Sequence, residues 1–262
     1  MDLEVFIGWD RTLRLAWQVS ARSLLLSAAS AGSAPPAIQP IGMQTLRAIG
    51  LYNRPTVTDA RGRLVDVLSD APMATEFALA RFFVPFVTKA RWALFCDGDF
   101  LFRGDVHELL RQAIAGGADR HAVMVVKHEH WPNERLKMEG ELQTSYERKN
   151  WSSLVLWNMA HAGVRRLSIH DANTQPGLWL HQFRWLFDQE IGELPIGWNW
   201  LEGSQLNHVA PESIRGVHFT RGTPDMPGYA NAAFAEEWRG HLIHDELVDL
   251  EAPCRQESSA TA

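Results

Sequence analysis

Two aspartates that flank one glycine are the feature of this sequence with the clearest chemistry. Asp97, Gly98 and Asp99 follow an apolar run over 90–95 and precede a second one over 100–102. Side chains two residues apart on an extended chain point to one face, so both carboxylates would face the same ligand. Two close carboxylates repel each other unless a cation neutralises them, and Mg²⁺ or Mn²⁺ prefers such oxygen ligands. Gly98 would allow a ligand to approach the backbone closely.

A solvated turn that caps a strand is the alternative interpretation of a bare Asp-x-Asp. The apolar flanks favour the metal site, because they put both charges beside the core, where an unpaired charge is costly. His218 is the second candidate ligand, at the end of a short strand predicted over 216–219, and a neutral imidazole suits Mn²⁺. A structural histidine at a strand end is the alternative for His218, since the chain has 11 histidines.

Positioning these residues requires an α/β fold. The apolar run over 4–8 predicts a buried strand that delivers Asp10 to a turn, and the spacing over 13–26 predicts a helix after it. In open α/β sheets, ligands bind beyond the carboxyl ends of the strands. Further strands are expected over 37–41, 90–95, 100–102, 121–127, 154–157, 193–200 and 216–219, and further helices over 73–87, 105–114 and 179–187.

Other segments are predicted to lack regular structure. Glycines and prolines punctuate 43–72, which predicts a loop-rich insert, and the charged stretch 129–149 predicts a mobile loop over a cleft. His128, His130 and Trp131 are candidates there for contact with an acceptor. Because no repeat or linker is present, we expect one domain over 1–253 and a frayed tail over 254–262.

The composition excludes several classes of protein. Hydrophobic residues make up 46% of the 262 residues and charged residues 21%, which is ordinary for a globular chain with a sizeable core. The net charge of -6 argues against a nucleic-acid-binding protein. The 11 tryptophans pack cores, but indole rings also stack on sugars. Cys96 is expected to be a reduced core thiol, which fits the cytoplasm, and no stretch is long and apolar enough to span a membrane.

Four segments together resemble a known family, the retaining glycosyltransferases of the GT-A fold, and are similar to the family 8 and glycogenin-like enzymes. The order and approximate separation of the four segments agree with that family. The segments are 5–10, 74–85, 93–102 and 217–222. The resemblance implies a single GT-A domain with a Rossmann-like mixed sheet flanked by helices.

The resemblance also implies roles for individual residues. Asp97, Asp99 and His218 would hold Mn²⁺ or Mg²⁺, and the cation would bridge the donor diphosphate. Gln182 would stabilise the oxocarbenium-like centre, and Arg81 would steady the donor phosphates. The residues expected to bind the donor are Asp10, Arg81, Asp97, Gly98, Asn150, Ser153, Arg221 and Gly222.

Three departures from the family pattern concern the sugar and phosphate contacts. An expected Asn-Ala-Gly is replaced by residues 151–153, so Asn150 is the candidate for the sugar-contacting amide. An expected Asp-Gln-Asp is replaced by residues 181–183, which keep only Gln182. The usual phosphate-binding lysine near 224–227 is missing, and Arg221 is the substitute candidate. The donor sugar is therefore expected to differ from glucose or galactose.

The prediction is a metal-dependent glycosyltransferase that transfers a hexose-type sugar, with retention, from a nucleotide sugar, with UDP as the expected nucleotide. The acceptor would be a glycan, a lipid-linked molecule or a protein, at a cytoplasmic location that includes the inner membrane face. A nucleotidyltransferase or other Mg²⁺- or Mn²⁺-dependent phosphoryl enzyme is one alternative, although the first strand lacks a Gly-rich phosphate loop. A non-catalytic carbohydrate- or nucleotide-binding relic of the fold is the other.

Overall fold

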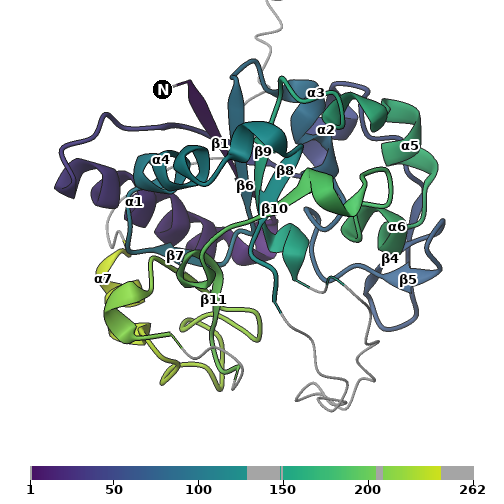
Figure 1. The fold of residues 1–262 in the computed structure, drawn as a ribbon. Helices are drawn as coiled ribbons and strands as arrows, with labels where there is room; N and C mark the ends of the chain where they lie inside the picture. Colours follow the sequence, from purple (N-terminus) through teal and green to yellow (C-terminus); the bar gives the residue numbers. More distant parts are fainter. Residues whose placement is uncertain (1, 129–147, 149, 205–208, 243–262) are drawn as a thin grey trace, which may run out of the picture.

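A mixed sheet of six strands, in the order β10-β8-β9-β6-β1-β2, forms the centre of the structure, a computed structural model that describes residues 2–128, 148, 150–204 and 209–242 (Figure 1). Only β9 is antiparallel to its neighbours, so the other five strands end at the same edge of the sheet. The strands are β1 (Leu3–Gly8), β2 (Ala37–Ile41), β6 (Trp92–Cys96), β8 (Val123–Val125), β9 (Leu154–Asn158) and β10 (Ile191–Glu193).

Helices cover both faces of this sheet (Figure 1). On one face lie α1 (Arg14–Ser30) and α4 (Val106–Ala115). On the other lie α2 (Met43–Ala48), α3 (Val84–Val87), α5 (Ile169–Thr174) and α6 (Gly177–His181). Alternate residues of a strand point to opposite faces, so Leu94 and Cys96 of β6 pack on the α1 side, while Ala93 and Phe95 pack on the α2 side. Cys96 is a buried free thiol, as predicted.

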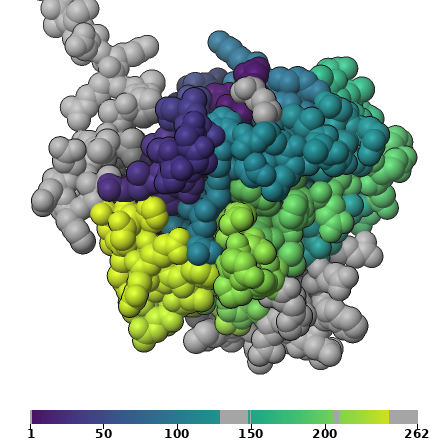
Figure 2. Space-filling model, turned by 60° about the vertical axis from the view of Figure 1, so that its left-hand side comes forward, coloured from purple at the N-terminus to yellow at the C-terminus, as the bar shows by residue number. Residues whose placement is uncertain are grey.

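A second sheet, in the order β11-β12-β7, holds the late part of the chain against α1. It contains β7 (Phe100–Phe102), β11 (Trp200–Leu201) and β12 (Gly216–His218), and α7 (Ala235–Gly240) packs beside it. Ser23 of α1 accepts a hydrogen bond from the Phe102 amide at 3.0 Å, and Ser27 donates to the Phe102 carbonyl at 3.1 Å. Figure 2 shows the described C-terminal segment, in yellow, against the purple α1.

The insert that the sequence predicted to be loop-rich, 43–72, is more regular than expected. It contains α2 and a three-stranded antiparallel sheet of β3 (Thr56–Thr58), β4 (Leu64–Asp66) and β5 (Ala71–Pro72). The buried guanidinium of Arg54 pairs with Asp66 at 2.6 Å and donates to the carbonyls of Ala172 and Gln175. The two hydrogen bonds to these carbonyls tie the insert to α5.

The predicted helix over 73–87 is wrong in its first half. Residues 74–79 form bends and turns, because the Glu76 amide donates to the Asp10 carboxylate at 2.8 Å and the Glu76 carbonyl accepts from the Met43 amide at 3.2 Å. Pro85 lies in the first turn of α3, where the missing amide hydrogen of a proline costs no helical hydrogen bond.

The predicted helix over 179–187 is too long, and the predicted strand over 193–200 is wrong over 194–199, where a loop and a 3-10 helix separate β10 from β11. α6 ends at His181, since Phe183 takes a left-handed φ of 52° and turns into an aromatic cluster with Trp157 and Trp185. β10 ends at Glu193 because Pro195 precedes a short 3-10 helix. The 3-10 helices are η1 (Arg11–Leu13), η2 (Ala80–Phe83), η3 (Ala118–Arg120), η4 (Trp151–Ser153), η5 (Val164–Arg166), η6 (Asp188–Glu190), η7 (Ile196–Asn199) and η8 (Pro211–Ser213).

Several predictions fall outside the described residues. They are the mobile loop over 129–149, of which only Arg148 is described, its residues His130 and Trp131, and the tail over 254–262. Within the part of the chain that the structure describes, no helix is both long and apolar enough to cross a membrane.

Gly98 gives a test of the fold at the edge where β1 and β6 end. A Cβ atom at Gly98 would lie 2.3 Å from the Gly8 carbonyl oxygen, so Gly98→Ala must push two backbone segments apart. We expect a loss of about 1–3 kcal/mol in the free energy of unfolding, measured with urea. Gly240→Ala is the control, because nothing lies within 4 Å of its Cβ position. Equal stability of the two variants would contradict this account.

Candidate functional site

Asp97, Asp99 and His218 come together at the edge where β6 ends. One ligand atom from each lies within 4.8 Å of the others. His218 Nε2 is 3.3 Å from Asp99 Oδ1 and 3.7 Å from Asp97 Oδ2. The antiparallel pairing of β12 with β7 places His218 opposite Phe100, beside Asp99. The sheet thus brings together residues more than a hundred positions apart, as the sequence predicted.

His218 is held in one orientation. Its Nδ1 lies 3.1 Å from Asn199 Oδ1, and the amide nitrogen of Asn199 donates to Ser153 Oγ at 2.8 Å. Because the Asn199 oxygen faces the ring, Nδ1 donates to it, which leaves the Nε2 lone pair directed at the carboxylates. Phe100 stacks on the imidazole with ring centroids 4.6 Å apart. A buried imidazole fixed in this way is typical of a metal ligand.

The three residues fit a divalent cation. Asp99 Oδ1 is buried and has no hydrogen-bond partner among the described residues, although His218 Nε2 lies nearby. Burial raises the pKa of Asp97 to about 6, and the charge of Arg81 opposes this shift. Two carboxylates and one imidazole form a mixed oxygen and nitrogen ligand set that suits Mn²⁺ and is compatible with Mg²⁺. A cation would relieve both the uncompensated oxygen and the repulsion between the acids.

Arg81 contacts the cluster directly. Its Nη1 lies 2.7 Å from Asp97 Oδ1 and donates to the Ser152 carbonyl at 2.8 Å, and its Nε donates to the Ala78 carbonyl at 2.9 Å. The guanidinium also lies over the Phe95 ring, 4.9 Å from the centroid, and the side chain is only 7% exposed. Arg81 therefore balances the charge of Asp97 from a rigid position.

Asp10 and Gly98 have contacts within the protein that the sequence did not reveal. Asp10 Oδ1 accepts from the Thr12 amide at 2.7 Å and from its hydroxyl at 2.6 Å, and Oδ2 accepts from the Glu76 amide. The close backbone approach at Gly98 is to the Gly8 carbonyl. Asp10 and Gly98 therefore help to fix the ends of β1 and β6 through these contacts within the protein.

The remaining candidate residues differ in how they contact the metal ligands and their neighbours. Ser153 belongs to the site, since its carbonyl accepts from the Asp97 amide at 2.9 Å. Asn150 takes a left-handed φ of 62°, and its carbonyl accepts from the Ser153 hydroxyl. The Gln182 side chain is buried, and its Oε1 accepts from Arg184 Nε at 2.7 Å. Arg221 is exposed, next to Gly222, and lies against Gly203.

Two further residues take part without a sequence signal. Asn199 lies in no motif, yet it orients His218. His181 Nδ1 is 2.8 Å from Ser152 Oγ, and burial lowers the pKa of this imidazole to about 3. The neutral His181 therefore supports the residue whose carbonyl holds Arg81. Only the fold brings these residues together, so composition and spacing could not identify them.

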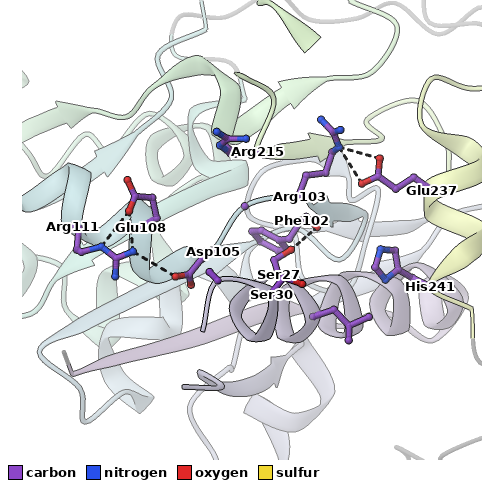
Figure 3. A pocket seen from close by; sticks show the side chains of 13 residues that line it. Ser27, Ser30, Phe102, Arg103, Asp105, Glu108, Arg111, Arg215, Glu237 and His241 are labelled. Carbon is purple, nitrogen blue, oxygen red and sulfur yellow. Dashed lines mark hydrogen bonds and ion pairs between the residues drawn. The ribbon is translucent and has the colours of Figure 1, made fainter. Parts of the chain in front are cut away.

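A hollow of about 540 Å³ lies at the other end of β7, between α1, α4 and α7 (Figure 3). Its charged groups are largely paired with one another. Arg103 donates twice to Glu237 at 3.0 Å, and Arg111 pairs with Glu108 at 2.8 Å and with Asp105 at 3.6 Å (Figure 3). This hollow carries no cluster of metal ligands among its described residues, and the candidate metal ligands lie at the Asp97 edge.

The mixed sheet with helices on both faces is the GT-A fold of glycosyltransferases. The galactosyltransferase LgtC in complex with donor and acceptor sugar analogs has a TM-score of 0.53 and 12% identity, over 91% of this chain and 94% of LgtC. The glycosyltransferase GlyE of Streptococcus pneumoniae TIGR4 has a TM-score of 0.55 and 13% identity, over 92% of this chain and 59% of GlyE. At these identities the likeness establishes the fold alone.

A curated relative shows the family. Protein CDI of Arabidopsis thaliana is 39% identical over 243 residues, which cover 91% of this chain and 85% of that protein, so the chain belongs to the family of Protein CDI. No family model matches the sequence.

The raised pKa of Asp97 predicts a pH dependence of stability in the metal-free protein. The folded state binds this proton more tightly than the unfolded state, whose pKa is near 3.8, so the contribution of Asp97 is present below pH 4 and lost as the pH rises through about 6. Urea unfolding with a chelator present should therefore show that Asp97→Asn gains stability relative to the natural protein between pH 4 and pH 7. The surface variant Asp119→Asn is the control, and the same pH profile for both variants would refute the prediction.

Proposed function

We propose that the chain is a metal-dependent glycosyltransferase that transfers a hexose-type sugar from a nucleotide sugar, preferably a UDP-sugar, to a hydroxyl acceptor. The observation that carries this proposal is the group of Asp97, Asp99 and His218 at the carboxyl edge of a GT-A sheet. This edge is where open α/β sheets bind their ligands. The sequence resemblance to the family 8 and glycogenin-like enzymes supports the same assignment and suggests retention of configuration.

The three ligands would bind Mn²⁺ or Mg²⁺, which supplies the positive charge that a leaving diphosphate requires. Arg81 already occupies one oxygen of Asp97, and this contact leaves Asp97 Oδ2 on the side of His218. Asn199 fixes the imidazole so that Nε2 stays available as a ligand. The residues would therefore bind and orient the donor, with no protein base required if the departing phosphate takes the acceptor proton.

The other donor contacts are part of the proposal. Asp10 would face the nucleoside at the end of β1, where its hydrogen bonds to Thr12 and Glu76 hold it. Arg221, an exposed cation with no ion pair among the described residues, would bind phosphate together with Gly222. Gln182 would contact the sugar on the face opposite the phosphate, with Arg184 fixing its amide. Gly98, Asn150 and Ser153 would line the same donor site.

A panel of nucleotide sugars tests the donor and the metal together. Thermal unfolding should be shifted upward by a UDP-sugar plus Mn²⁺, and the shift should disappear with a chelator, because the nucleotide and the cation bind only the folded state. Free nucleoside diphosphate should be the product, whereas pyrophosphate would indicate nucleotidyl transfer. The absence of a shift with every nucleotide sugar and metal would refute the proposal.

Variants of the metal ligands test the site itself. Asp97→Ala, Asp99→Ala and His218→Ala should each abolish the Mn²⁺-dependent thermal shift and reduce donor turnover by about a hundredfold or more, as expected when a cation that stabilises the transition state is lost. Asp119→Ala is the matched control, since that carboxylate pairs with Arg91 at the surface. An unchanged metal-dependent shift in Asp97→Ala would remove the metal role.

We also propose a cytoplasmic location for the protein, including the inner membrane face. The free, buried thiol of Cys96 supports a reducing compartment. Cell fractionation tests this proposal, and recovery of the native protein from an oxidising compartment would overturn it.

A further inference from the structure

Lys127 and His128 follow β8 at the sheet edge that carries Asp97. β8 and β6 both pair antiparallel with β9, so they run in the same direction and end on the same side. Lys127 Nζ lies 5.6 Å from the centroid of the Trp151 ring and has no carboxylate or hydrogen-bond partner among the described residues. A half-buried ammonium that no described carboxylate pairs with is unusual in a chain whose net charge is -6.

A second cation shares the same ring. The guanidinium of Arg148 lies 5.5 Å from the Trp151 centroid, and its Nη1 donates to the Gln182 carbonyl. Its described carboxylate partner is Asp188, whose side chain is 87% exposed. Attraction to the aromatic ring favours the placement of each cation beside Trp151. Asp188 pairs with Arg148, so the surface around Trp151 carries the positive charge of Lys127, which no described carboxylate balances.

His128 adds a polar atom to this positive surface. Its Nε2 is buried and has no partner among the described residues, and its backbone carbonyl accepts from Trp151 Nε1 at 3.3 Å. Burial lowers the pKa of His128 to about 4, so the ring is neutral near pH 7. A neutral imidazole with a free nitrogen can form a hydrogen bond with a substrate hydroxyl.

Trp151 is connected to Asp97 and His218 through one 3-10 helix and a short series of hydrogen bonds. It begins η4, which ends at Ser153, and the Ser153 carbonyl accepts from the Asp97 amide at 2.9 Å. The Ser153 hydroxyl accepts from Asn199, which in turn orients His218. The Lys127 surface is thus fixed relative to the reacting centre.

We propose that Lys127 and His128 form an acceptor subsite that binds a sugar bearing an anionic group, a carboxylate or a phosphate. Lys127 pairs with the anion, and His128 forms a hydrogen bond with a hydroxyl of the same sugar. This inference rests on the proposed function, in which the donor diphosphate is matched by the bound cation and by Arg221. Lys127 is therefore left for a second anion.

Matched sugar pairs test the subsite. Protein saturated with UDP and Mn²⁺ is titrated calorimetrically with methyl glucuronide against methyl glucoside, and with glucose 6-phosphate against glucose. At low salt the charged member of at least one pair should bind at least about fivefold more tightly, and added NaCl should reduce this preference. The two pairs distinguish a carboxylate from a phosphate.

Three variants separate charge from folding. Lys127→Met should abolish the preference for the charged sugar, Lys127→Arg should retain it, and Lys89→Met, at an exposed lysine, should leave it unchanged. His128→Leu should weaken the neutral and charged members of each pair alike, because it removes a hydrogen bond and no charge.

Three results would overturn the acceptor subsite. They are equal binding or no binding of the charged and neutral sugars, a preference that survives in Lys127→Met, and a preference seen only between UDP-glucuronate and UDP-glucose, which would place the anion on the donor. UDP with Mn²⁺ is measured separately by thermal shift. Failure there refutes the donor proposal, whereas success there with no sugar preference refutes only this inference.

Discussion

The repulsion between two partly buried carboxylates at the end of β6 is the interaction on which the rest of the site depends. Asp97 and Asp99 lie beside the core, and burial raises the pKa of Asp97 to about 6 because the charged form loses solvation there. The fold offsets part of this cost with the guanidinium of Arg81 on one side, while His218 on the other side presents Nε2 as a further metal ligand. Both partners are themselves restrained, Arg81 by the Ser152 carbonyl and His218 by Asn199. A divalent cation would complete the same compensation, so the residues that stabilise the acids are those that would position the metal.

The topology explains how one short motif recruits such distant residues. β9 runs antiparallel between β6 and β8, and the segment that precedes it therefore lies at the carboxyl edge. Ser153 in that segment bonds to the Asp97 backbone and to Asn199, which links the first sheet to the second. β7 continues directly from Asp99 and pairs with β12, which carries His218. A single chain reversal after β6 thus joins the two sheets at the metal ligands.

The sequence predicted the group that could hold a metal ion because its signal is local. Asp97 and Asp99 stand between two apolar runs, His218 ends a short strand, and both patterns survive in the structure. It did not identify Asn199 or the pairing of Arg81 with Asp97, since these contacts exist only after the strands have assembled. The helices predicted over 73–87 and 179–187 failed for a related reason. Glu76 bonds to Asp10 and Met43, and Phe183 turns into an aromatic cluster, so tertiary contacts override local helical spacing.

The two halves of the site are held by different forces, which bears on what each can do. Backbone hydrogen bonds fix the metal half, from the Asp97 amide to the Ser153 carbonyl and from the Phe219 amide to the Asp99 carbonyl. The substrate half near Trp151 relies on cations packed against one ring, a contact that constrains direction less strictly than a hydrogen bond. Substitution of the side chains packed against Trp151 would therefore leave the backbone hydrogen bonds of β6 and β12 in place. The proposed chemistry therefore belongs to the GT-A framework, whereas in the proposed acceptor subsite the choice of substrate would depend on Lys127, His128 and their neighbours.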